Sequence, residues 1–381
     1  MSMDINSETV KTDVYTAIAY QKGFLYKGEI PSIREDFEEI VKYFPEHRLT
    51  LHELYSIYKE DDKEKAEDYL LKLVSKYPHD HEYLFELLLL YSNYSNDNWD
   101  KQKDIESIFS KLKKYGYETP SFLKWQAEQA LLFNDVISSI SFLKKSLSIY
   151  KNDQKSRIKI AKLYYLIGEF KLSYENLLKI NPVEKNATLY RIEGICNFFL
   201  ENFKNALKLL ESVILVEPND VYALYFLGDI EERQRHSWKS DNYFTKIISR
   251  SSFSTDEMAV ASLAFLILNE TPRAEQCIEM NLQNSPDHMY SRFVHGIIML
   301  SQKKFHKAYE SFNEVYDCDY FLLKREFSLI KKSLKKSLID EFLKFVEKHD
   351  ENLYLFFSLD LNREIFSEKA EILDDNKIDS V

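Results

Sequence analysis

Residues 187–220 read ATLYRIEGICNFFLENFKNALKLLESVILVEPND, and this 34-residue stretch decides the fold. Its apolar residues recur at the three- and four-residue spacing of amphipathic helices. Small residues stand at position eight, Gly194, and at position twenty, Ala206, while Pro218 stands at position thirty-two. We expect two helices that approach closely at the small residues, the second of which ends before the proline because proline lacks a backbone donor.

The same pattern recurs along the chain in one register. Units that start at residues 120, 154, 187, 221, 255 and 289 keep a small residue at position eight, or at position twenty, or at both. In the unit that starts at 221, positions eight, twenty and twenty-four are Gly228, Ser240 and Phe244. In the unit that starts at 289, they are Gly296, Ala308 and Phe312. Weaker units cover 14–46, 47–80 and 81–119, the last with a five-residue insertion around 93–99. We therefore expect about eight repeats over residues 14–322.

This pattern resembles the tetratricopeptide repeat (TPR) family, in which each unit is a pair of antiparallel helices. The resemblance implies an all-α, right-handed α-solenoid of about eight TPR-like helix pairs, closed by a C-terminal capping segment that hides the last apolar face. The expected divisions are an N-terminal tail at 1–13, degenerate repeats at 14–119, clear repeats at 120–322, capping helices at 323–366 and a disordered acidic tail at 367–381.

Composition supports a helical, core-forming chain and narrows the classes of partner. Only 7 of the 381 residues are glycine and 8 are proline, too few for the turns of a β-rich fold. Aromatic residues make up 14% of the chain, which favours a packed core. The formal net charge is −11, so we expect no nucleic acid partner, because phosphate backbones attract basic surfaces.

The sequence carries no recognisable catalytic or metal-binding motif. Cys196, Cys277 and Cys318 lack the close spacing of a zinc site or a disulfide framework, so we expect free buried thiols. The His79-Asp80-His81 cluster lies at a repeat junction, where a solvated loop is expected. We therefore expect no enzyme activity, no cofactor and no metal.

Two observations bear on the compartment. No apolar stretch reaches the roughly 18 residues of a membrane span, and the polar start at 1–14 is unlike a signal peptide. We expect a cytoplasmic protein, or a periplasmic one if a targeting segment has been removed.

The TPR resemblance also implies a binding surface. In that family, positions two, five, nine and twelve of the first helix face a concave groove. These positions, together with Arg233 one step beyond position twelve, predict a set of partner-binding residues in which tyrosine and arginine, common in interface hot spots, are frequent: Lys124, Lys162, Tyr165, Arg191, Phe198, Tyr222, Tyr225, Arg233 and Phe293. The alternative is that several of these aromatic side chains pack against neighbouring helices.

The predicted groove fits an extended or helical peptide with apolar anchors. Three cations, Lys124, Lys162 and Arg191, fall in consecutive units and suggest an acidic group on the partner. One TPR subfamily clamps the acidic C-terminal tail of a chaperone with lysine, arginine and asparagine at set positions. Lys124 fits that clamp, but Glu128 replaces an asparagine, so chaperone-tail binding is disfavoured.

The segment Lys324–Lys336 is a second candidate surface, because six basic residues alternate there with apolar ones. A basic amphipathic helix can make a weak contact with an anionic membrane surface. The alternative is a capping helix whose lysines keep the end of the solenoid soluble. The acidic residues that follow, Asp340 and Glu341, favour the cap.

Taken together, the residues favour a non-catalytic protein–protein interaction scaffold that binds a peptide or partner protein in the groove. One alternative is a stoichiometric structural subunit of a bacterial envelope or motility assembly, which exposed apolar faces on several repeats would favour. Another is a peptide-sensing regulator, which a single deep pocket near Arg191 and Tyr225 would favour. The oligomeric state and the partner's identity stay open.

Overall fold

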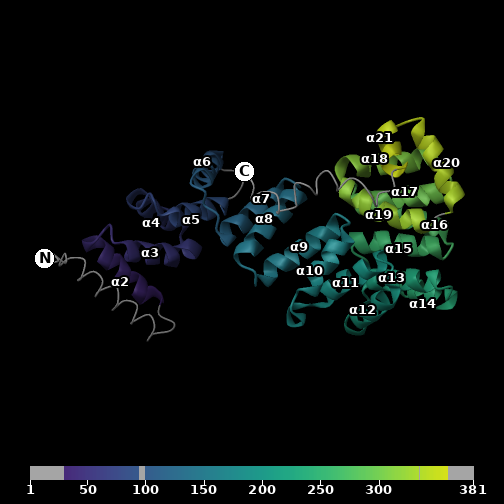
Figure 1. Cartoon of the computed structure of the whole chain (residues 1–381), viewed down its shortest axis with the longest axis horizontal. Helices are drawn as coiled ribbons and strands as arrows, with labels where there is room; N and C mark the ends of the chain where they lie inside the picture. Colours follow the sequence, from purple (N-terminus) through teal and green to yellow (C-terminus); the bar gives the residue numbers. More distant parts are fainter. Residues whose placement is uncertain (1–29, 94–98, 334, 359–381) are drawn as a thin grey trace, which may run out of the picture. The chain divides into compact units, whose positions relative to one another are not determined.

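The structure is a computed structural model that describes residues 30–93, 99–333 and 335–358, and all its regular elements there are helices (Figure 1). After α2 (Ile30–Tyr43), eight consecutive pairs follow: α3 (Arg48–Asp61) with α4 (Lys63–Lys76), α5 (His81–Ser92) with α6 (Trp99–Lys114), α7 (Pro120–Leu132) with α8 (Val136–Ile149), α9 (Gln154–Leu166) with α10 (Phe170–Leu178), α11 (Ala187–Phe199) with α12 (Phe203–Val216), α13 (Val221–Arg233) with α14 (Ser237–Ile248), α15 (Thr255–Ile267) with α16 (Thr271–Asn284), and α17 (Met289–Ser301) with α18 (Phe305–Cys318). A short 3-10 turn, Pro182–Glu184, lies between α10 and α11. Three more helices end the described chain: α19 (Tyr320–Ser333), α20 (Lys336–Glu347) and α21 (Glu351–Ser358).

The expected all-α fold of paired antiparallel helices is confirmed. The first helices of the six clear repeats begin at residues 120, 154, 187, 221, 255 and 289, where the sequence places the unit starts. Of the unit at 14–46, only the second helix, α2, falls within the described residues. The expected tails at 1–13 and 367–381 and most of the insertion at 93–99 lie outside them.

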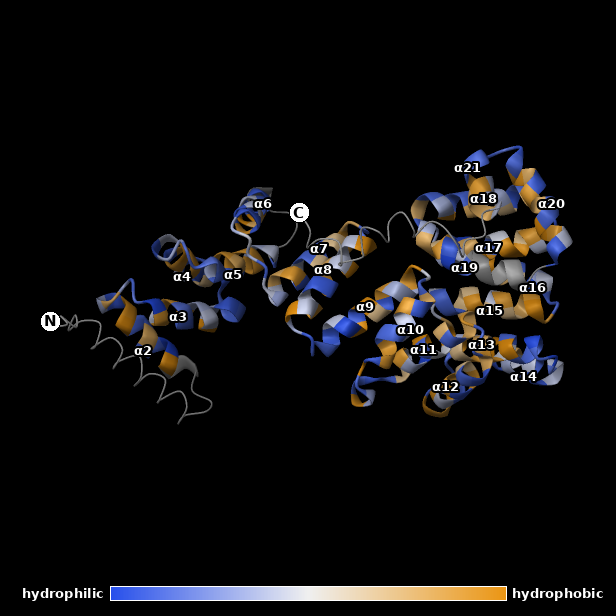
Figure 2. Ribbon diagram, in the orientation of Figure 1, coloured by the Kyte–Doolittle hydropathy of each residue, from blue (hydrophilic) through white to orange (hydrophobic). Residues whose placement is uncertain are grey.

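The chain divides after Phe122 into two compact units, each with its own core. In the first unit, Phe85, Tyr117 and Phe122 pack their rings together beside buried leucines of α3 to α5. In the second unit, apolar side chains fill the space between successive helices from α7 to α21. Figure 2 shows these hydrophobic residues on the helix sides that face neighbouring helices.

Each first helix of the clear repeats starts at a capping residue. The capping side chain accepts a hydrogen bond from a backbone N–H in the first helical turn, which satisfies a donor that the helix itself leaves unpaired. Each capping residue is the last residue of the preceding unit, which has 33 or 34 residues in every case except that of Thr119. The six capping residues are Thr119, Asp153, Asn186, Asp220, Ser254 and His288.

The turn inside each clear repeat uses a left-handed backbone at position fifteen. The residue there has a positive φ between 57° and 79° in six consecutive units, and only one of the six is glycine: Asn134, Gly168, Glu201, Arg235, Asn269 and Lys303. A left-handed conformation costs a non-glycine residue about 1–2 kcal/mol. The packing of the two helices therefore imposes the turn, which explains how the chain forms so many turns with so little glycine.

The small residue at position eight packs directly against the large residue at position twenty-four of the same pair. A Cβ atom added to Gly228 would lie 2.7 Å from the ring of Phe244, and Gly296 and Phe312 show the same separation. Position twenty-four therefore packs within its own helix pair, where the rings of Phe244 and Phe312 are fully buried.

The helices after the last pair form one core with it. Leu323 of α19, Phe342 of α20 and Phe357 of α21 are fully buried with Phe312 of α18. This agrees with the expected capping segment, which contains three helices and begins with α19 at Tyr320.

The structure shows how far each cysteine is buried and whether a described helix could span a membrane. All three cysteines are free, but only Cys196 is buried, while Cys277 is half-buried and Cys318 is exposed. The expectation of three buried thiols is therefore wrong for Cys318, which ends α18 and faces outward. Within the described residues, no helix has the length and apolar character needed to cross a membrane.

We predict that Gly228→Ala lowers the free energy of unfolding by about 1–3 kcal/mol, because the new methyl group overpacks against the immobile ring of Phe244. Thermal unfolding followed by circular dichroism measures the loss. The chain itself supplies the compensating partner, since Ala127 and Ala161 at position eight face Leu143 and Leu177 at position twenty-four.

The double variant Gly228→Ala/Phe244→Leu should therefore lose less free energy of unfolding than the sum of the losses in the two single variants. Simple additivity of the two losses would show that the two positions do not set each other's size.

Candidate functional site

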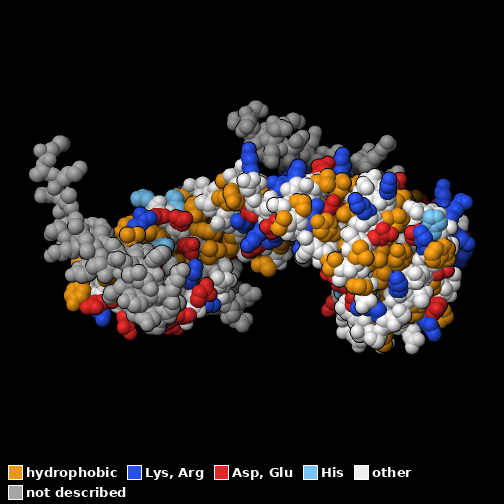
Figure 3. Space-filling view, turned by 90° about the horizontal axis from the view of Figure 1, so that it is seen from below, with side chains coloured by type: hydrophobic (Ala, Val, Ile, Leu, Met, Phe, Trp, Pro, Cys, Tyr) orange, Lys and Arg blue, Asp and Glu red, His pale blue; other side chains and the backbone are white. Residues whose placement is uncertain are grey.

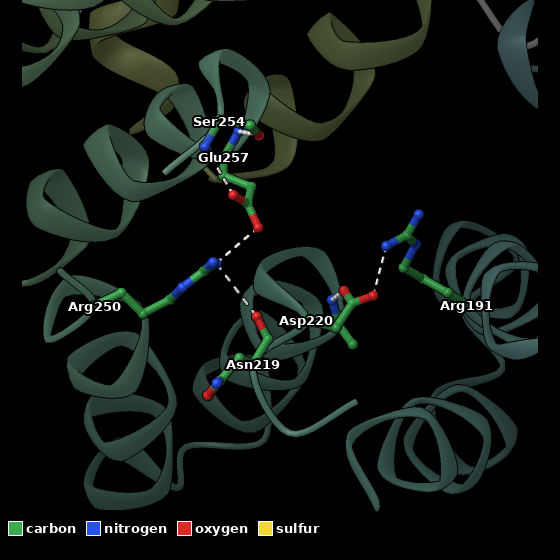
Figure 4. A network of polar contacts seen from close by, with 7 residues as sticks. Arg191, Asn219, Asp220, Arg250, Ser254 and Glu257 are labelled. Carbon is green, nitrogen blue, oxygen red and sulfur yellow. Dashed lines mark hydrogen bonds and ion pairs between the residues drawn. The ribbon is translucent and has the colours of Figure 1, made fainter. Parts of the chain in front are cut away.

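The cation at position five of a first helix binds the capping aspartate of the next first helix. Lys124 Nζ lies 3.0 Å from Asp153 Oδ2. Arg191 Nη1 lies 2.5 Å from Asp220 Oδ2, and Figure 4 shows this second pair. The carboxylates are only 8% and 3% exposed, and each also accepts a backbone N–H through its other oxygen. These two cations therefore fasten consecutive repeats to each other.

The pKa of Asp153 reflects this arrangement. Burial acts to raise it, but the hydrogen bonds from the Ser156 backbone and from Lys124 outweigh burial and lower the pKa of Asp153 below its ordinary value. The ionised carboxylate is thus favoured in the folded state, and its pairing with Lys124 stabilises the junction.

A second network joins the next two repeats at the same edge of the molecule. Arg250 Nη1 donates to Glu257 Oε1 at 2.7 Å and to the carbonyl oxygen of Asn219 at 3.3 Å (Figure 4). Glu257 also accepts the backbone N–H of Ser254, which completes a capping box at the start of α15. The first helices from α11 to α15 are therefore held in order by polar contacts at their N-terminal ends.

A cavity of about 1230 Å³ lies in the second unit, between the first helices and the C-terminal segment. Its walls come from α11, α13, α15 and α17, with Tyr165 of α9 and with residues of α19 and α20. Many lining residues fall at positions two, five, nine and twelve of their units, including Tyr165, Arg191, Ile195, Tyr222, Tyr225, Asp229, Leu263, Leu266, Tyr290 and Ile297.

Helix α19 reaches back to α9 and closes the cavity on that side. Lys324 Nζ lies 3.3 Å from Glu169 Oε1, and Arg325 Nη1 donates to the carbonyl oxygen of Leu166 at 3.3 Å. The Arg325 guanidinium also lies 5.5 Å from the ring centre of Tyr165. We call Lys324 and Arg325 the clasp, because they join segments more than 150 residues apart in the chain.

The clasp removes part of the basis for a membrane-surface contact. The Lys324 and Arg325 side chains are 10% and 12% exposed and face α9 and Glu326, so they cannot also face lipid. Lys335 and Lys336 are exposed. The side chains of Lys331 and Lys332 lie outside the described residues.

Four tyrosines line the cavity, and all four are held in the protonated form. Burial raises the pKa of Tyr165 to about 12, and it also raises the pKa values of Tyr222, Tyr225 and Tyr290. Among the residues that the structure describes, none of these hydroxyls has a hydrogen-bond partner in the protein. Each can therefore donate to and accept from a bound molecule.

The arginines of the cavity are already paired. Arg233 lies 3.2 Å from Asp229 and 5.1 Å from the ring centre of Phe198. The Arg191 guanidinium, which is paired with Asp220, also lies 5.1 Å from the ring centre of Tyr222. Burial raises the pKa of Asp229 more than Arg233 lowers it, which marks a strongly desolvated carboxyl group.

Of the nine residues predicted from the sequence, six line the cavity: Tyr165, Arg191, Tyr222, Tyr225, Arg233 and Phe293. Phe293 is only 1% exposed and packs against Phe312, so it contributes to the floor of the cavity. Phe198 is 3% exposed and packs against Phe203 and Phe226, which makes it a core residue. Lys124 and Lys162 do not belong to the cavity lining, and Lys162 is exposed on α9.

Sequence reasoning missed two groups of lining residues. Asp256, Leu263 and Leu266 of α15 stand at positions two, nine and twelve, so the same positional rule applied to this unit finds them. Arg325 and Glu326 come from α19, which lies beyond the repeats. No periodic signal in the sequence indicates that this helix folds back to α9.

One serine–histidine–aspartate arrangement occurs, but it serves as a helix cap. His288 Nε2 lies 2.7 Å from Asp256, and its Nδ1 lies 2.6 Å from the Ser291 hydroxyl and accepts the Ser291 backbone N–H. Ser291 is fully buried and also accepts a hydrogen bond from Asn281, so no substrate reaches it. In the described ranges, no three or more histidine, cysteine or acidic residues are placed to hold a metal ion.

No protein-family model matches the chain. Solved structures with a similar fold are TPR proteins. A thermophilic TPR protein from Thermus thermophilus, TTC0263, is 12% identical with a TM-score of 0.39, over 48% of this chain and 99% of that one. YrrB, described as a TPR protein with an unusual peptide-binding site, is 17% identical with a TM-score of 0.31, over 43% and 86%. A chain of the APC/C hetero-tetramer Cut9–Hcn1 is 14% identical with a TM-score of 0.40, over 79% and 73%.

We predict that Lys124→Met destabilises the chain at pH 7 by about 1 kcal/mol, because it leaves the buried Asp153 carboxylate without its ion pair. Since the folded pKa of Asp153 is lowered, its stabilising contribution is present above the unfolded pKa of about 3.9 and is lost as pH falls through the folded value. Urea unfolding should therefore separate variant from wild type at pH 7 and bring them together near pH 2–3.

The matched control is Lys162→Met, an exposed lysine on the neighbouring first helix, which should change stability little at either pH. An equal loss from Lys124→Met at both pH values would show that packing of the lysine stem, and not the ion pair, is responsible.

We predict that Lys324→Glu or Glu169→Lys opens the clasp, because each single change places like charges together. Backbone hydrogen–deuterium exchange over residues 164–170 should become several-fold faster in each single variant. The double variant Lys324→Glu/Glu169→Lys should recover much of the protection. Lys208→Glu on the exposed face of α12 is the control, and exchange that is unchanged in the single variants would contradict the clasp.

Proposed function

We propose that the protein is a non-catalytic binding protein that takes a short peptide segment of a partner into the cavity between the first helices and α19. The observation that carries this proposal is the cavity itself. Ligand pockets bring together apolar walls and a few polar groups that fix orientation, and here aliphatic walls surround four tyrosine hydroxyls. The groove positions of five consecutive units contribute to this one space.

The dimensions of the cavity favour a peptide over a small metabolite. Its volume of about 1230 Å³ lies above the ~300–1,000 Å³ of pockets for drug-sized molecules. Lining residues run from Tyr290 to Ser301 on α17, which is about 17 Å along the helix axis. An extended chain rises about 3.3 Å per residue, so this length accommodates about five residues.

The position of the cavity supports the regulator hypothesis among the alternatives. A deep pocket that includes Arg191 and Tyr225 is the feature expected of a protein that captures a peptide or a signalling ligand. Residues of α19 form one wall of the cavity, and the clasp holds α19 against α9. A bound segment would therefore contact the C-terminal helices directly.

A second candidate, a structural subunit of an assembly, is favoured by a different observation. Large apolar side chains are exposed near the C-terminal ends of three consecutive second helices, α8, α10 and α12: Ile149, Tyr150, Leu178, Leu215 and Val216. Such a recurring pattern supports a protein-binding surface outside the cavity.

Neither candidate requires nucleic acid. Figure 3 shows lysine and arginine interspersed with aspartate and glutamate on the face it presents, without a continuous basic stripe. The net charge of −11 points the same way.

We predict that a library of fluorescent hexapeptides contains binders, measured by fluorescence polarisation with the full chain. The variant Tyr222→Phe/Tyr290→Phe keeps both rings and removes two hydroxyls. It should weaken a selected binder about tenfold, because each lost hydrogen bond is worth about 0.5–1.5 kcal/mol.

Tyr43→Phe, an exposed tyrosine outside both the cavity and the apolar helix ends, is the control and should leave affinity unchanged. Binders that are insensitive to the cavity variant would move the site to the exposed apolar ends of α8, α10 and α12. The absence of any binder at millimolar protein would contradict peptide capture.

A further inference from the structure

We infer that the peptide segment accepted by the cavity is uncharged, with apolar or aromatic side chains, and that the tyrosine hydroxyls bind its backbone. This inference rests on the proposed function and names the chemistry of its ligand. It departs from the acidic partner that three basic residues in consecutive units suggested, because two of the three, Lys124 and Arg191, are held in ion pairs with capping aspartates.

The first step concerns the arginines, which are the groups that would recognise an acidic ligand. Arg191 is paired with the nearly inaccessible Asp220, Arg233 with Asp229, and Arg325 with Glu326 at 2.7 Å. A ligand carboxylate would approach these existing carboxylates and be repelled by them. To compete, it would have to replace a partner that is already in place and partly desolvated.

The remaining charged lining side chains lie toward solvent. Lys303 is 2.9 Å from Glu341, and Asp256 is 2.7 Å from His288 Nε2. Glu232 and Lys335, of opposite sign, are exposed. The charged groups of the cavity are thus either paired with carboxylates or exposed to solvent, while a charge that enters the cavity would still lose its hydration.

The third step concerns what the cavity does offer. Tyr165, Tyr222, Tyr225 and Tyr290 present hydroxyls without a hydrogen-bond partner among the described residues, and each can both donate and accept. The N–H and C=O groups of a peptide backbone match this pattern. The side chains of Ile195 and Leu263 also line the cavity and suit an apolar anchor of the ligand.

Three matched sets of blocked hexapeptides test the inference: neutral apolar, acidic and basic, each N-acetylated and C-amidated. Dissociation constants are measured with the full chain at 50 mM and 500 mM NaCl. The neutral set should bind at least tenfold more tightly, and its affinity should change less than twofold between the two salt concentrations, because no ion pair forms.

Tighter binding of the acidic or the basic set, with affinity that falls as salt rises, would overturn the inference and leave peptide capture intact. Failure of all three sets would instead contradict peptide capture itself, and the inference with it. The two failures are therefore distinguishable.

A specificity switch provides an independent measurement. Asp220→Asn keeps a good capping residue for α13 and removes the charge that holds Arg191. Arg191 should then accept a ligand carboxylate, so the acidic set should gain about tenfold in affinity and become salt-dependent. The neutral set should change little.

Asp153→Asn is the matched control, because it changes the same type of capping residue and ion pair outside the cavity. The acidic set should not gain affinity with it. If acidic peptides already bind the wild type as well as they bind Asp220→Asn, the pairing of Arg191 does not determine the ligand's charge, and the inference fails.

Discussion

The contact between position eight and position twenty-four is the constraint on which each helix pair depends. Where position eight is glycine, as in Gly228, a ring such as Phe244 lies against the helix backbone itself. Leucine occupies position twenty-four both opposite a glycine, as in Gly194 and Leu210, and opposite Ala127 or Ala161. The two residues together set the distance between the helices of a pair. That distance imposes the left-handed turn at position fifteen and brings the first helices side by side, so that their groove positions meet in one cavity.

Electrostatics then joins the pairs, and it explains why a functional interpretation of the cations fails. Lys124 and Arg191 occupy groove positions, and in the sequence they look like charges available to a partner. Each instead neutralises the capping aspartate of the next first helix, which packing has already removed from water. An unpaired carboxylate costs more free energy when it is buried than when it is exposed. The two cations therefore pair with the capping aspartates at the repeat junctions. The cavity retains hydrogen-bonding tyrosines and little net charge, and this combination defines the ligand we propose.

The cavity also depends on a contact that is remote in the chain. Through the clasp, α19 meets the turn after α9, and its other side belongs to the core of the last repeat. The C-terminal segment thus caps the last pair, as expected, and also supplies a wall to the cavity. A capping face is expected because the end of a solenoid must be covered. The contact between α19 and α9 depends instead on the rotation from one helix pair to the next, and this rotation accumulates over five repeats.

The sequence by itself determined the helical class, the 34-residue period and the first residue of each clear repeat. These features are local, because the spacing of small, large and capping residues within one unit suffices to specify them. Only the tertiary structure decided that Phe198 is a core residue, that the groove arginines are paired, and that Arg325 and Glu326 complete the cavity. Arg191 pairs with a residue 29 positions away and Arg325 contacts one 159 positions away, whereas Arg233 pairs within its own helix. A periodic pattern records neither the distant partners nor which of the local pairs form.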